Sequence, residues 1–128
     1  MLNLNRNTRL FFFQYIFQRD YTKDFELEEF VKQNLRKRPC NKKKLKTLYQ
    51  SFLSNYDHIK SLIDNEILKK TNKITIFLIY AFFSEYFINK DKKKILMGEY
   101  IKLSKDFLTF EEVKYFNFLI DDISKKAP

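Results

Sequence analysis

Glycine, proline and tryptophan are almost missing from this sequence of 128 residues, which has one glycine, two prolines and no tryptophan. Tight β-hairpin turns need residues that accept positive φ, above all glycine, so a sheet built from hairpins is not expected. A glycine-rich phosphate-binding loop is excluded for the same reason. What remains are long stretches rich in Lys, Glu, Leu, Phe and Ile, and these predict an all-α protein.

Cysteine and histidine occur once each, as Cys40 and His58. A single cysteine cannot form an intrachain disulfide, which is typical of a reducing compartment and predicts a cytoplasmic protein. A lone histidine without a second ligand at metal-binding spacing predicts no metal site, and we expect no cofactor. Long hydrophobic runs are also missing, because Ile74–Ile88 is shorter than the roughly 18–20 residues of a membrane span. Met1–Arg9 is too polar for a signal peptide.

Catalytic motifs are missing as well. No nucleophile motif of the G-x-S-x-G type occurs. Acidic residues do cluster, but as neighbours within single predicted helices, for example Glu28 and Glu29, or Asp121 and Asp122. Adjacent residues on a helix point about 100° apart and do not converge on one substrate or metal. The sequence therefore predicts a protein that is not an enzyme.

Positive charge is abundant. The chain has 25 lysines and arginines against 16 aspartates and glutamates, a net charge of +9. Such a balance favours a polyanionic partner, most often nucleic acid, although a lysine-rich proteome would give the same composition. The most basic segment, Arg36–Lys44, is a candidate phosphate-facing loop or simply a solvated connection.

Apolar residues recur at helical spacing along most of the chain. About seven helices are expected in a single domain over residues 1–128, with an N-terminal lobe of about 1–70 and a C-terminal lobe of about 71–128. Ile74–Ile88 is apolar nearly all round, which predicts a central helix packed on several sides. The other predicted helices are Leu10–Arg19, Asp24–Arg36, Leu45–Asn55 and Asp57–Leu68 (separate or as one bent helix), Lys93–Phe107, and a last helix after Thr109 that runs to Lys125.

The last two helices form a hairpin with a clear start signal. Thr109 followed by Glu112 is a capping box, so the final helix should begin directly after Thr109. Asn117 falls inside the apolar stripe of this helix, and we expect a buried amide bonded to backbone groups. Lys114 and Tyr115 lie off the stripe. The stripe predicted to face the core consists of Phe110, Val113, Phe116, Ile120 and Ile123.

Several segments, in order along the chain, resemble one known family. Residues 97–107, MGEYIKLSKDF, are similar to the I-N-E-A-V-E-L-A-K-K-F segment of the NusB transcription antitermination family, and residues 114–121, KYFNFLID, to its K-F-V-N-G-V-L-D. Glu85 falls where the family's L-R-x-A-x-Y-E ends. Gly98 and Phe118 stand where the family has asparagine and glycine. The start of the chain resembles the family's R-x-x-R…Q…Y pattern through Arg6, Arg9, Gln14 and Phe17.

This resemblance implies an all-α fold of two small packed helical bundles and a role in transcription. Proteins of the NusB family bind the boxA element of ribosomal RNA transcripts together with the ribosomal protein NusE, and so help RNA polymerase resist termination. Lysine, arginine and tyrosine suit single-stranded RNA, which is bound by cations along its backbone and by aromatic rings that stack on bases. The RNA contacts implied are Arg6, Arg9, Glu111, Lys114 and Tyr115. The NusE-facing residues implied are Phe17, Thr75, Tyr80 and Glu85.

Other functions remain open at this stage. The same helical domain precedes a catalytic domain in ribosomal RNA cytosine methyltransferases. A helical protein-interaction module with weakened RNA binding is a further alternative, as is a basic DNA-binding protein, although no recognition helix with clustered Arg, Asn and Gln is evident. A homodimer is also compatible with the sequence.

Overall fold

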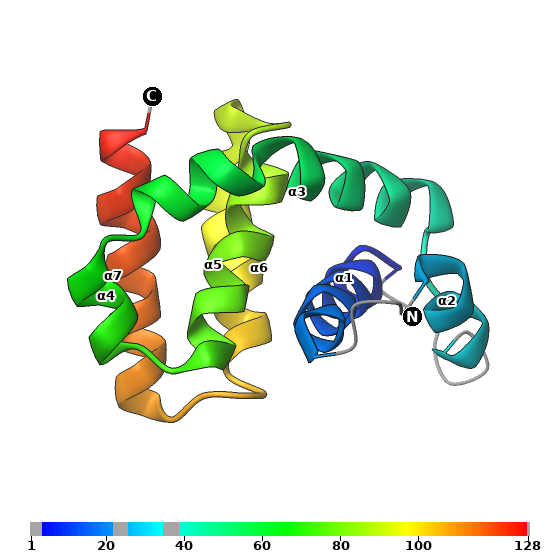
Figure 1. The fold of residues 1–128 in the computed structure, drawn as a ribbon, viewed down its shortest axis with the longest axis horizontal. Helices are drawn as coiled ribbons and strands as arrows, with labels where there is room; N and C mark the ends of the chain where they lie inside the picture. The colour runs from blue at the N-terminus through cyan, green and yellow to red at the C-terminus, as the bar shows by residue number, and fades with distance from the viewer. Residues whose placement is uncertain (1–3, 22–25, 35–38, 128) are drawn as a thin grey trace.

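The computed structural model describes residues 4–21, 26–34 and 39–127 (Figure 1). Within these residues the chain forms seven α-helices, one short 3₁₀ helix and no strand, which confirms the all-α prediction. In chain order the elements are α1 (Leu4–Tyr21), α2 (Leu27–Asn34), α3 (Lys42–Leu62), α4 (Asn65–Lys70), α5 (Lys73–Tyr86), η1 (Lys90–Lys92), α6 (Lys93–Ser104) and α7 (Phe110–Lys126).

The boundaries of α3 and α4 refine the sequence prediction. Of the two alternatives for residues 45–68, no break occurs near residue 56, and α3 continues to Leu62. Asp64 then caps the short α4 by accepting from the Ile67 amide. At its other end α3 begins inside the basic segment, because Asn41 caps it by accepting from the Lys44 amide. Lysines 42–44 are therefore helical and not part of a loop. Residues 36–38 of that segment, and the predicted start of a helix at Asp24, lie outside the described residues.

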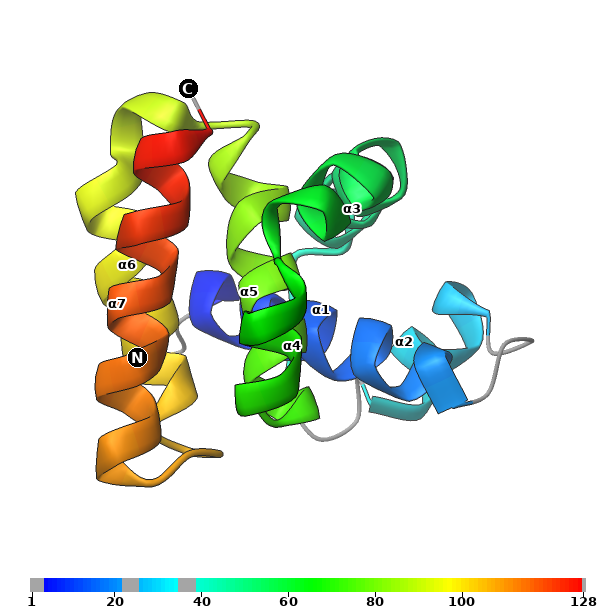
Figure 2. The same ribbon diagram turned by 60° about the vertical axis from the view of Figure 1, so that its left-hand side comes forward.

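Helix α5 occupies the centre, as predicted. It packs against α1, α3, α6 and α7 (Figures 1 and 2), and every residue from Thr75 to Tyr86 is buried. None of the described helices combines the length and apolar character that crossing a membrane requires.

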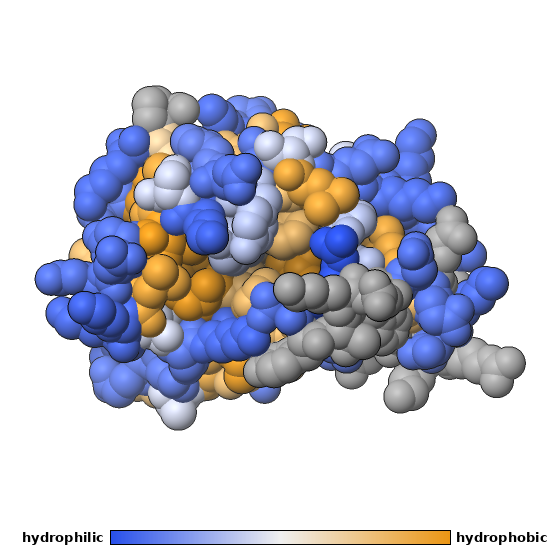
Figure 3. Space-filling view, viewed as in Figure 1, coloured by the Kyte–Doolittle hydropathy of each residue, from blue (hydrophilic) through white to orange (hydrophobic). Residues whose placement is uncertain are grey.

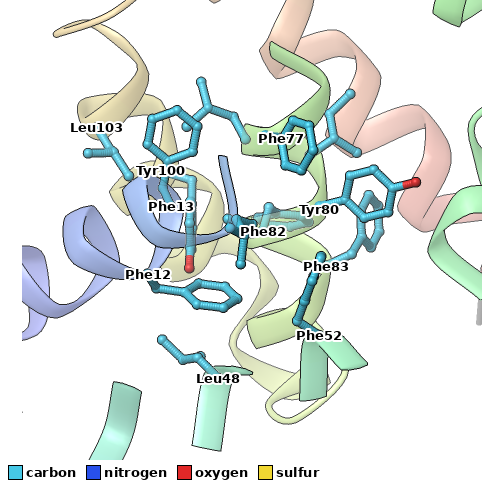
Figure 4. Packing of buried hydrophobic residues seen from close by; sticks show 14 of the residues in the cluster. Phe12, Phe13, Leu48, Phe52, Phe77, Tyr80, Phe82, Phe83, Tyr100 and Leu103 are labelled. Atoms are coloured by element: carbon cyan, nitrogen blue, oxygen red, sulfur yellow. The ribbon is translucent and has the colours of Figure 1, made fainter. Parts of the chain in front are cut away.

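Aromatic rings of α5 pack against rings from α1 and α6 (Figure 4), and Phe12, Phe82 and Tyr100 are fully buried. A phenylalanine side chain buried in this way stabilises the fold by about 1.5–3 kcal/mol.

The hairpin of α6 and α7 begins and ends close to the predicted residues. The capping box at Thr109 is confirmed, since the Thr109 amide donates to Glu112 at 2.9 Å and the Glu112 amide donates to the Thr109 hydroxyl at 3.3 Å. The Asn72 side-chain amide also donates to the Glu112 carboxylate, which ties the start of α5 to the start of α7. Helix α6 ends at Ser104, three residues before the expected Phe107.

The buried face of α7 differs from the predicted stripe. Asn117 is exposed, and the expected buried amide is therefore wrong. Phe110 is 72% exposed and does not face the core. A spacing of three residues covers about 300° of a helix, so two such steps from Phe110 to Phe116 move about 120° around it. Side chains that reach the core are Phe116, Leu119, Ile120, Ile123 and Ser124.

Gly98 gives a prediction about stability. It lies within α6, and a methyl group added there would meet no atom within 4 Å, so the glycine does not serve a close helix approach. Gly98→Ala should raise the free energy of unfolding by about 0.5–1 kcal/mol, because alanine loses less backbone entropy on forming a helix. Urea unfolding followed by circular dichroism measures this. The matched variant Gly98→Val should gain less, and a loss of stability in the alanine variant would contradict the expectation.

Candidate nucleic-acid interface

Arg9 and Glu85 form a bidentate ion pair inside the protein. Arg9 of α1 donates from Nε to Glu85 Oε1 at 2.8 Å and from Nη2 to Oε2 at 2.9 Å, across 76 residues of sequence. The two side chains are 10% and 2% exposed. Two parallel charge-assisted bonds fix both groups in orientation as well as position. The pair therefore sets how α1 lies against α5.

Tyr100 and Lys44 complete the surroundings of the Glu85 carboxylate. The Tyr100 hydroxyl donates to Oε1 at 2.9 Å, and Lys44 Nζ lies 3.3 Å from Oε2. Burial would raise the pKa of Glu85, but the hydrogen bonds and charge of Arg9, with Lys44 and Tyr100, outweigh it and hold the pKa below its ordinary value of 4.5. The ionised carboxylate thus connects α1, α3, α5 and α6.

Arg6 and Arg9, both predicted to contact RNA, lie in different surroundings. Arg6 is exposed, whereas Arg9 is 8% exposed and bonded to Glu85. Residues three apart on a helix point about 60° apart, which is enough to place one outside and the other inside. The burial of Arg9 gives it a positioning role for α1, and a direct contact with RNA stays a prediction.

A basic groove lies between the start of α1 and the end of α6. It encloses about 270 Å³ and is lined by Arg6, Lys102 and Lys105, with Leu10, Leu103 and Asp106. Lys102 lies 3.8 Å from Glu99, but its side chain is 58% exposed, and a surface pair of this kind holds a side chain weakly. The sequence analysis did not name either lysine as an RNA contact. Their spacing of three residues at the end of one helix, which places them on the same side, was the available signal.

Three of the predicted RNA residues lie in the first turns of α7, shortly after the groove in the chain. Glu111 and Lys114 are exposed and Tyr115 is half-buried against the core. Lys114 Nζ lies 4.5 Å from the centre of the Phe110 ring. The start of α7 thus presents a cation and aromatic rings close to the turn that follows Lys105.

The four predicted partner-facing residues do not share an exposed surface. Thr75, Tyr80 and Glu85 are buried, and Phe17 is half-buried. Their contact with NusE stays a prediction. Glu85 lines a separate pocket together with Lys43 and Lys44 of α3. Phe17 and Tyr80 lie directly behind another surface feature, because each packs against a ring that lines the recess described next.

This recess lies between α1, α3 and α5, where Figure 3 shows apolar side chains surrounded by hydrophilic ones. It encloses about 390 Å³. Phe17 packs against Phe77 with ring centres 5.7 Å apart, and Tyr80 stacks on Tyr56 at 5.2 Å. The lining residues are Ile16, Arg19, Asp20, Phe52, Leu53, Tyr56, Asp57 and Phe77. An apolar floor with charged sides is chemically suited to a protein segment.

The buried ion pair predicts a dependence of stability on pH. The pKa of Glu85 is lower in the folded than in the unfolded protein, so its stabilisation is complete above about pH 4.5 and is lost as the pH falls further. Glu85→Gln should lower the free energy of unfolding at neutral pH by roughly 3–5 kcal/mol, because Arg9 is left buried without its main counterion.

Urea unfolding at several pH values compares the two proteins. The difference between wild type and Glu85→Gln should shrink as the pH falls. Glu99→Gln is the control, since Glu99 is more exposed and lies 3.8 Å from Arg9, and it should cost less than about 1 kcal/mol. A constant difference at every pH would contradict the role of the ionised carboxylate.

The candidate interface thus combines an open basic groove with a buried network that holds its helices.

Among the residues that the structure describes, no three His, Cys, Asp or Glu side chains are placed to hold a metal ion. The chain matches no family model, no curated protein and no solved structure.

Proposed function

We propose that this protein is a cytoplasmic, non-catalytic RNA-binding factor of the NusB type, which binds a boxA-like single-stranded RNA. The observation that carries the proposal is the basic groove of Arg6, Lys102 and Lys105. Three cations and one carboxylate, Asp106, line this groove, in a protein with net charge +9. Neutralising phosphates with such side chains releases condensed counterions, which is the main source of affinity for nucleic acid.

The start of α7 extends the proposed RNA path. Lys114 adds a cation, and Tyr115 offers an aromatic ring for stacking on an unpaired base. In this arrangement Arg9 acts through α1, because its bond to Glu85 keeps Arg6 at the edge of the groove. The RNA-binding set of the proposal is therefore Arg6, Lys102, Lys105, Lys114 and Tyr115, with Glu111 at its border.

The apolar recess supports a second part of the proposal, a protein partner. In the NusB family this partner is NusE, in the transcribing RNA polymerase complex, and the recess backed by Phe17 and Tyr80 is the surface best suited to it. The same recess would serve an interaction module that binds no RNA. If that second candidate function is right, the protein binds its partner, and substitution of the groove lysines changes neither this binding nor any RNA affinity.

The groove gives a prediction about RNA affinity. Arg6→Ala combined with Lys102→Ala should weaken binding to a boxA-like RNA and lower the slope of log K against log salt concentration by about 0.7 for each cation removed. Fluorescence anisotropy with labelled RNA over a salt series measures both quantities. The folded state is checked by thermal unfolding, which these exposed positions should leave nearly unchanged.

Two controls distinguish the proposal from its competitors. Lys60→Ala removes an exposed charge from α3, which does not line the groove, and should leave the slope close to that of the wild type. A scrambled RNA should bind more weakly than the boxA-like RNA, and more so when NusE is present. Equal binding of both RNAs would indicate a polycation without sequence preference. Absence of RNA binding at low salt would contradict the proposal and favour the second candidate function, a protein-interaction module.

A further inference from the structure

Two phenylalanines of α7 are exceptional in their exposure. Phe110 is 72% and Phe118 is 60% exposed, whereas every other phenylalanine whose side chain the structure describes is buried or half-buried. They are separated by eight positions, with Lys114 midway, so all three side chains lie along one side of the helix. We call this stripe of Phe110, Lys114 and Phe118 the α7 aromatic face.

The geometry of the α7 aromatic face separates its rings. Eight residues of an α-helix span about 12 Å, whereas stacked bases lie about 3.4 Å apart. One base therefore cannot lie against both rings, and each ring must meet a different base. Lys114 between them holds its ammonium 4.5 Å from the Phe110 ring centre, over one face of that ring. A base on Phe110 would therefore stack on the opposite face.

Charges near the α7 aromatic face do not repel a polyanion as strongly as the sequence suggests. Asp121 lies within 3.1 Å of Lys93 and Lys125, and Asp122 lies 3.2 Å from Lys126. Glu112 is occupied as the capping carboxylate at Thr109. Three of the four acidic side chains of this helix are thus held by groups within the protein, while Glu111 is exposed beside Phe110. Lys114 lies over the Phe110 ring and is the cation of the stripe.

We propose that the α7 aromatic face is a base-stacking site for single-stranded RNA, in which Phe110 and Phe118 each hold one unpaired base and Lys114 binds a phosphate of the backbone that runs between them. This inference rests on the proposed RNA-binding function and names the aromatic contacts that the groove lacks. Stacking on an aromatic ring tolerates any base, because every base has a π-face. A protein partner is less well matched, since lysine is depleted from the cores of protein interfaces.

The test compares wild type with Phe110→Ala, Phe118→Ala and the double variant. The ligands are a boxA-like RNA of about 12 nucleotides and an oligomer of the same length whose ribose-phosphate backbone carries no bases. Each alanine should weaken binding of the RNA by roughly 5- to 150-fold and leave binding of the base-free oligomer and the salt slope unchanged. Phe118→Tyr keeps a ring and should bind as the wild type does.

Ile95→Ala is the matched control, because Ile95 of α6 is 64% exposed and cannot stack. A double variant that binds the RNA as tightly as the wild type would overturn the stacking site while leaving the proposed function intact. A wild-type protein that binds neither ligand would overturn both. Self-association of the wild type that the double variant abolishes would also overturn the inference and assign the face to a second copy of the chain.

Discussion

The buried ion pair of Arg9 and Glu85 is the constraint on which the packing of the helices depends. Removing two charges from water costs several kcal/mol for each, and only near-ideal geometry offsets this cost. Here the carboxylate receives both arms of a guanidinium, a tyrosine hydroxyl and a nearby ammonium, which come from α1, α6 and α3. These groups coincide only when all four helices are in register, so the pair disfavours alternative packings of the core.

An aromatic core needs a constraint of this kind. Hydrophobic burial is non-directional, and cores of suitable total volume often accept more than one arrangement. Phe11, Phe12 and Phe13 of α1 are all buried although they point in different directions, so apolar burial alone does not fix the rotation of α1 about its axis. A rotation of about 60° would turn Arg6 towards the interior and Arg9 away from Glu85, and would leave a buried charge without its carboxylate. The ion pair thus decides which arginine faces the groove, and so links the interior to the proposed RNA surface.

Local features of this fold could be predicted from the sequence, whereas contacts between distant residues could not. The capping box at Thr109 and the all-round apolar character of α5 are encoded within a few neighbouring residues, and both predictions are confirmed. The buried face of α7 was misjudged because Phe110 fits the same spacing pattern as a core residue. Nothing local distinguishes the buried Arg9 from the exposed Arg6. The groove joins α1 to α6, across almost a hundred residues, and no pattern within either helix indicates it.

The turn between α6 and α7 couples the groove to the α7 aromatic face. Phe107 in this turn packs against Phe13 of α1 with ring centres 5.1 Å apart, and Thr109 immediately fixes the direction of α7 through its capping box. A ligand that contacts α1, α6 and α7 therefore meets groups whose backbone is already held in place. Binding costs less ordering entropy when the site is preorganised. A weaker Phe13–Phe107 contact would leave every RNA-facing side chain present, but it would loosen the position of the groove cations relative to the rings of α7.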